Sequence, residues 1–160
     1  MRYGRFFAMI ATSTVVMYGL MYLNTYSIDH IEFSQTRMWM AIYMGSVMAV
    51  IMLAFMLGMY SDRKKNIAIF IGSGLAFLLS LWLVRSQETV EDLAWMRAMI
   101  PHHSIAILTS ERADISDPRV RALADAIIEA QRDEIAEMKS YIADIEENGN
   151  APAGTRRTAD

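Results

Sequence analysis

The sequence predicts an all-α protein in which three transmembrane helices precede a two-helix hairpin of the four-helix-bundle type. Three observations predict this class. The first is a set of three long segments without Asp, Glu, Lys or Arg, at residues 6–23, 38–60 and 67–84. The second is the dense charge that begins after Ser86, and the third is the spacing of three to four residues between apolar positions in that later part. A membrane domain therefore precedes a water-exposed helical domain.

Each uncharged segment is about 18–23 residues long, which is enough for a helix to cross the ~30 Å hydrocarbon core of a bilayer. We expect a membrane domain over residues 1–85, with helices at about 6–26, 38–60 and 67–84. Because Arg2 and Arg5 precede the first segment, it could instead be a signal peptide. It lacks a clean small-x-small cleavage site, so we predict a retained helix.

Fixed positive charge indicates the orientation of these helices in the bilayer. Basic residues cluster at the N-terminus and again at residues 63–65, whereas the segment 24–37 has Arg37 as its one fixed positive charge. The positive-inside rule then places the N-terminus and the 63–65 cluster in the cytoplasm. We expect the bacterial inner (cytoplasmic) membrane, with residues 86–148 forming a periplasmic or extracellular domain.

The first helix of that domain is expected from about Thr89 to Ala113. Thr89 followed three residues later by Asp92 resembles an N-terminal capping arrangement, although the third membrane helix could equally continue through Ser86. Pro101 lies inside this helix, where it removes a backbone hydrogen bond and should produce a kink.

The second helix is expected from Pro118 to about residue 147. Asp117 as N-cap and Pro118 as first helical residue predict its start, and Gly149 suits its end. The tail 149–160 is expected to be disordered. The predicted apolar seam of this helix comprises Val120, Ala124, Ile127, Gln131, Glu134, Met138, Tyr141 and Ile145. A hairpin this small buries too little surface to be stable alone, so it needs a packing partner. This partner could be a second copy, the membrane domain or another subunit.

Soft metal ligands are concentrated in the first helix of the hairpin. Met99, His102 and His103 stand at i, i+3 and i+4 and share one helix face, with Met96 one turn earlier. Thioether sulfur with imidazole nitrogen favours Cu(I). The second helix carries Gln131, Glu134 and Met138 at one-turn spacings, and these residues could face the first set. We therefore predict a copper site between the two helices.

Composition is compatible with this prediction without deciding it. The chain has 14 Met and no Cys, as expected for copper chemistry outside the cytoplasm and also for an ordinary membrane protein. Met40, Met44, Met48, Met52 and Met56 form a row at i, i+4 spacing that could guide Cu(I) through the membrane; we interpret it as a packing ridge. Asp29, His30 and Glu32 could add a metal contact, but an ordinary solvated loop is the favoured interpretation.

Two stretches resemble a known family. Asp92-Leu-Ala-Trp-Met-Arg-Ala-Met-Ile-Pro-His-His-Ser-Ile-Ala106 and Ile128-Glu-Ala-Gln-Arg-Asp-Glu-Ile-Ala-Glu-Met138 resemble the CopM-like family, long catalogued as domain of unknown function 305. The match covers about residues 91–142. The resemblance implies a ferritin-like helical bundle, usually exported, that binds copper through Met and His.

Matching the family pattern to this sequence residue by residue implies a set of candidate ligands. The candidate ligands are Met96, Met99, His102, His103 and Met138, joined by Glu134, with Gln131 and Asp92 as supporting residues. Many members have a further Met just after this His-His segment, where this chain has Thr109 or a neighbour, so the ligand number stays open.

The function predicted from sequence is a membrane-anchored protein that sequesters Cu(I) or delivers it to a copper-accepting protein. The alternative is a non-enzymatic accessory or assembly subunit of a membrane complex, in which the Met/His motif serves helix packing. We expect the lipid bilayer as a partner, together with a homo-oligomer or a membrane complex, and no nucleic acid. We do not expect an enzyme, because the sequence has no Glu-x-x-His, His-Glu-x-x-His, P-loop or Gly-x-Ser-x-Gly motif.

Overall fold

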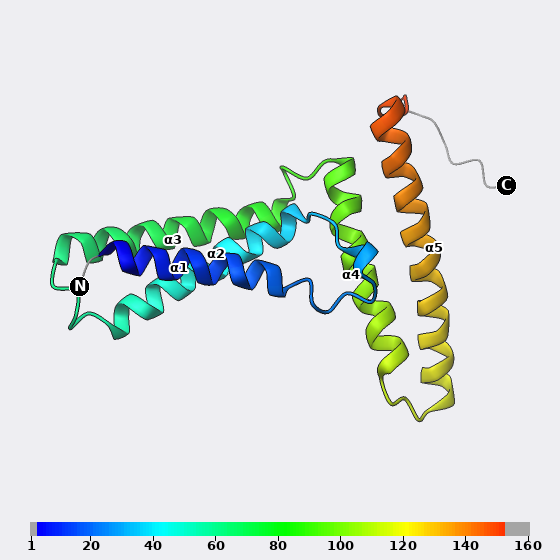
Figure 1. The fold of residues 1–160 in the computed structure, drawn as a ribbon, viewed down its shortest axis with the longest axis horizontal. Helices are drawn as coiled ribbons and strands as arrows, with labels where there is room; N and C mark the ends of the chain where they lie inside the picture. The colour runs from blue at the N-terminus through cyan, green and yellow to red at the C-terminus, as the bar shows by residue number, and fades with distance from the viewer. Residues whose placement is uncertain (1–2, 153–160) are drawn as a thin grey trace. The chain divides into compact units, whose positions relative to one another are not determined.

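The computed structural model describes residues 3–152, and this part of the chain is all-α, with no strand (Figure 1). Its elements are α1 (Tyr3–Leu20), the 3₁₀ helix η1 (Ile28–His30), α2 (Gln35–Phe55), α3 (Arg63–Ser86), α4 (Asp92–Arg112) and α5 (Pro118–Asn148). The chain divides into two compact units. We call residues up to 24 with 34–90 the membrane unit, and residues 25–33 with those from 91 onward the hairpin unit.

In the membrane unit, α2 packs against both α1 and α3. Ser34 caps α2 by accepting a hydrogen bond from the Arg37 N–H at 3.2 Å, and Asp62 caps α3 in the same way through the Lys65 N–H at 3.1 Å. Gly45 lies so close to the Thr14 side chain that a Cβ atom at this position would overlap it. The α1–α2 contact therefore requires glycine at this position.

Two helices in the described part, α2 and α3, are long and apolar enough to cross a membrane, with mean hydropathy of 2.0 and 2.4. Only 22% and 11% of their apolar windows are buried inside the protein, so most of this hydrophobic surface faces outward. In α1, Arg5 and the run Thr12-Ser13-Thr14 lower the apolar character. The helices begin and end a few residues away from the predicted bounds, and α1 ends at Leu20 rather than near residue 26.

The hairpin unit consists of α4 and α5, which pack against each other, and η1, which contacts α4. Its core contains Met96, Ile100, Ile107, Ile135, Met138 and Ile142. Asp117 caps α5 by accepting from the Arg119 N–H at 2.8 Å, Pro118 opens the helix, and Gly149 ends it with φ = 78°. The predicted turn and both ends of α5 are confirmed. The predicted disordered tail falls mostly on residues 153–160, outside the described residues.

Two expectations for the start of α4 need correction. Thr89 does not cap α4: the helix begins at Asp92 after Glu91, and Gln87 in a left-handed conformation (φ = 55°) ends α3 first. The third and fourth helices are therefore separate. Pro101 does lie inside α4 and is buried.

The predicted seam of α5 was partly wrong. Ala124, Met138 and Ile145 do face α4, whereas Val120, Ile127 and Tyr141 are 48%, 36% and 43% exposed. Ile128, Ile135 and Ile142 occupy the inner positions instead. The buried face shares positions 124, 138 and 145 with the predicted seam and takes its other apolar residues from the neighbouring positions 128, 135 and 142.

Candidate metal site

His103 is the predicted ligand whose setting differs most from an ordinary surface side chain. Its side chain is 13% exposed, and Nδ1 lies 3.1 Å from a carboxylate oxygen of Glu134 on the facing helix. The two groups lie within ion-pair distance, but buried Nδ1 forms no hydrogen bond with the described residues. A ring nitrogen in this state retains a lone pair or a proton that no protein group satisfies.

The polar residues predicted on α5 do meet this histidine. Gln131 donates from its amide nitrogen to Glu134 Oε2 at 3.2 Å, the same oxygen that approaches His103. Glu134 itself is exposed, which corrects its predicted place inside the seam. The three side chains therefore form a polar group at the edge of the α4–α5 core.

The predicted thioether ligands lie in the adjoining core. Met96 and Met138 are 5% and 6% exposed and belong to the buried cluster, and Met99 packs against that cluster from a half-buried position. Met99 also precedes His103 by four residues, so the two side chains share a helix face. The three methionines thus belong to the α4–α5 core, a position that fits ordinary core packing by adaptable methionine and that also keeps soft sulfur on the helices that carry His103 and Glu134.

Two predicted residues lie apart from this group. His102 is exposed, and its ring centroid is 6.2 Å from that of His103, with the planes tilted by 54°. Asp92 opens α4 and accepts a hydrogen bond from Asn150 at 3.1 Å. It lies eleven residues before His103, or ~16 Å along the helix axis. We therefore remove Asp92 from the candidate site.

Hard ligands alone do not make a site in the described part of the chain. Within residues 3–152, no group of three or more His, Cys, Asp and Glu side chains is arranged to hold a metal ion. Thioether sulfur joining the imidazole and the Glu134 carboxylate would make a mixed donor set at His103. Such a donor set selects soft ions over Mg²⁺ or Ca²⁺.

The charge state of His103 follows from its burial. Desolvation lowers the pKa of its imidazole; the nearby Glu134 carboxylate opposes this shift, and His102 adds to it. The neutral ring is the form that binds a metal. Near neutral pH, protonation therefore competes little with coordination at this residue.

Ser104 connects the segment 25–33 to α4. Its buried hydroxyl accepts from the Tyr26 N–H at 2.7 Å and is hydrogen-bonded to His30 Nδ1 at 2.9 Å. Lys139 on α5 donates to Asp29 at 2.6 Å. This segment is therefore a packed part of the hairpin unit, which corrects the favoured interpretation of a solvated loop. A regular spacing could not reveal it, because the contacts come from single residues of an irregular segment.

Comparison with known proteins places the hairpin in a named family. Residues 90–160 match the family model described as Domain of unknown function (DUF305). The chain is also 30% identical over 142 residues to "Uncharacterized protein L153" of Acanthamoeba polyphaga mimivirus, an alignment that covers 84% of this chain and 91% of that protein. No solved structure matches.

Proposed function

We propose that this chain, which belongs to the same family as the mimivirus protein and carries a DUF305 domain, is a membrane-anchored copper-binding protein. In this proposal the hairpin unit holds Cu(I) outside the cytoplasm through Met and His side chains, as in the CopM-like family that its motifs resemble. The protein sequesters the ion or transfers it to a copper-accepting partner.

The single observation that carries the proposal is the buried Nδ1 of His103, which faces the Glu134 carboxylate and forms no hydrogen bond with the described residues. A buried polar atom without a hydrogen-bond partner is costly, and a bound ion would satisfy it. Glu134 stands 3.1 Å away on the opposite helix, so both helices contribute to the same point. A site shared by two helices fits a binder that releases its ion when the helices separate slightly.

The choice of Cu(I) follows from the neighbouring sulfur atoms. Met99 lies one turn before His103, and Met96 and Met138 belong to the core cluster against which Met99 packs. With one imidazole available and no thiolate in the chain, thioethers must supply the remaining donors. Thioether ligands favour Cu(I) over Zn²⁺.

Anchoring is inferred from the outward-facing apolar surface of α2 and α3. Antiparallel packing of these two helices puts the beginning of α2 and the end of α3 on one side of a bilayer, and both lead into the hairpin unit. With α1 as a third span, the positive-inside rule assigns that side to the periplasm or the cell exterior of a bacterial inner membrane.

The test is a Cu(I) competition titration of the full chain in detergent against a chromogenic chelator. We expect about one ion per chain, and His103→Ala should abolish tight binding while Met99→Leu weakens it. Met59→Leu is the matched control, because Met59 is an exposed methionine of the membrane unit. Unchanged copper stoichiometry in His103→Ala would overturn the assignment.

A second candidate function, an accessory subunit of a membrane complex, is favoured by an apolar row left open on the hairpin. Val120, Leu123 and Ile127 on α5 are 48%, 60% and 36% exposed. Pairing this row with a second copy would complete a ferritin-like four-helix bundle. A chain that assembles through this row and binds no copper would favour this candidate over the first.

A further inference from the structure

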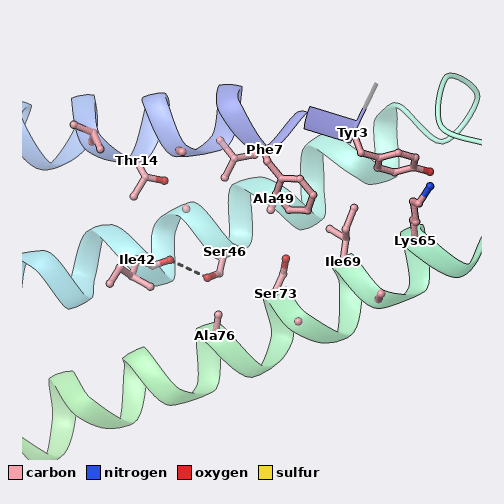
Figure 2. A pocket seen from close by; sticks show the side chains of 16 residues that line it. Tyr3, Phe7, Thr14, Ile42, Ser46, Ala49, Lys65, Ile69, Ser73 and Ala76 are labelled. Carbon is pink, nitrogen blue, oxygen red and sulfur yellow. Dashed lines mark hydrogen bonds between the residues drawn. The ribbon is translucent and has the colours of Figure 1, made fainter. Parts of the chain in front are cut away.

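A groove lies on the surface of the membrane unit, over α2 and between α1 and α3 (Figure 2). Its volume is about 660 Å³, and its walls are almost entirely apolar. Small residues make up much of the lining, among them Gly45, Ala49, Gly72 and Ala76. All the residues that line it belong to the membrane unit.

One end of the groove is charged. Lys65 and Tyr3 lie together there, with the Lys65 ammonium 5.3 Å from the centre of the Tyr3 ring (Figure 2). Lys65 pairs with Asp62 at 3.0 Å, and its exposed ammonium has further donors. Arg63 and Lys64 precede it and are also exposed. This end therefore carries the net positive charge that attracts an anionic headgroup.

The length of the groove matches one leaflet of a bilayer. Along α3 its lining runs from Lys65 to Ala76, a rise of ~16 Å at ~1.5 Å per residue. One leaflet contributes about half of the ~30 Å hydrocarbon core. The groove thus begins at the charged membrane surface and ends near the bilayer centre.

We propose that this groove binds one acyl chain of an anionic phospholipid, with the phosphate held at Lys65. A cationic rim over an apolar channel one leaflet deep complements such a lipid in charge and in length. A transmembrane helix from a second copy would need a contact surface through both leaflets. The inference rests on the proposed membrane anchoring and is independent of copper binding.

Two glycines of α3 allow a matched test of the groove. A Cβ at Gly72 or at Gly74 would meet nothing within 4 Å, so the backbone at either position has open space where a side chain would begin. Gly72 lines the groove, whereas Gly74 does not. Gly72→Leu therefore fills the channel, whereas Gly74→Leu adds the same side chain to α3 outside the groove. Ala68→Leu is a second filling variant, from another lining residue.

The experiment is native mass spectrometry of the full chain in detergent with phosphatidylglycerol or phosphatidylcholine of identical acyl chains. We expect wild type and Gly74→Leu to retain phosphatidylglycerol in preference to phosphatidylcholine, and Gly72→Leu and Ala68→Leu to lose the bound lipid. Lys65→Gln should lower the preference about fivefold. Circular dichroism reports whether each variant is folded.

Two results would overturn the proposal. The first is equal lipid retention by folded Gly72→Leu and wild type. The second is a change from dimer to monomer in Gly72→Leu without any lipid signal in wild type, which would assign the groove to a helix of a second copy. Copper titration of the same samples keeps the two proposals apart, because Gly72→Leu should bind copper like wild type.

Discussion

The two units of this protein distribute their polar and apolar side chains in opposite ways. In the membrane unit, large apolar residues such as Ile71, Leu75 and Trp82 are more than half exposed. The buried polar side chains there are Ser34, Ser46, Asn66 and Ser80. In the hairpin unit, isoleucine and methionine fill the core, and charged residues cover the outside.

This difference is the one expected if the membrane unit faces lipid, as proposed above, while the hairpin unit faces water. An apolar surface is costly in water and inexpensive in lipid, while charged side chains have the reverse preference. Within α2 and α3, the buried serine hydroxyls bond to their own helix, as Ser46 does to the Ile42 carbonyl at 2.9 Å. In the hairpin unit, polar side chains link separate elements, as Arg97 does by pairing with Glu32 and Glu146. In the membrane unit, polar contacts between elements lie near the helix ends, as between the Tyr3 hydroxyl and Asn66 Oδ1 at 2.8 Å.

The largest expected effect is a difference in unfolding free energy between substitutions of one isoleucine from each unit. Ile100 is fully buried in the hairpin core, and Ile71 is 60% exposed on α3. Ile100→Ala should cost about 2–5 kcal/mol of unfolding free energy, and Ile71→Ala less than ~0.5 kcal/mol. Thermal unfolding of the full chain in detergent, followed by circular dichroism, measures both. Equal losses would mean that the outer face of α3 is packed against protein rather than lipid.

A smaller effect is expected for the hydrogen bonds that hold residues 25–33. Ser104→Ala leaves the Tyr26 N–H and His30 Nδ1 without their partner, at a cost of about 1–3 kcal/mol. Hydrogen exchange in residues 25–33 should then increase while the membrane unit is unaffected. Thr109→Ala is the control, because this exposed hydroxyl bonds only to carbonyls of its own helix. Equal exchange in both variants would remove Ser104 from this role.

The smallest expected effect is a pH dependence confined to the hairpin unit, which contains all three histidines. Burial lowers the pKa of His30; the Asp29 carboxylate opposes this shift, and Lys139 adds to it. Because the unfolded state binds the proton more readily, the stabilisation is present above the unfolded pKa of about 6.5 and is lost as pH falls below it. Hydrogen exchange of residues 25–33 in chelator-treated samples should rise from pH 7.5 to 5.5. A similar rise in His30→Gln would contradict this origin.

The sequence was sufficient for features that depend on local chemistry. Charge-free segments predicted the helices of the membrane unit, and Asp117-Pro118 with Gly149 predicted both ends of α5. The inner face of α5 was only partly predictable, because neighbouring apolar positions satisfy the same spacing and only packing against α4 decides which of them are buried. The sequence suggested that Gln131 and Glu134 could face the histidines; in the structure Glu134 approaches His103 and Gln131 contacts Glu134, whereas His102 is exposed.

The attachment of residues 25–33 to α4 and α5 makes the hairpin unit a discontinuous one, assembled from two stretches of chain separated by α2 and α3. During synthesis the first stretch is complete long before its docking surface exists, so the unit finishes folding only when α5 has been made. A protease that cut the exposed linker at Glu88 or Thr89 would not release the hairpin at once. It would leave a split protein, whose two fragments stay together through the contacts of Tyr26, Asp29 and His30.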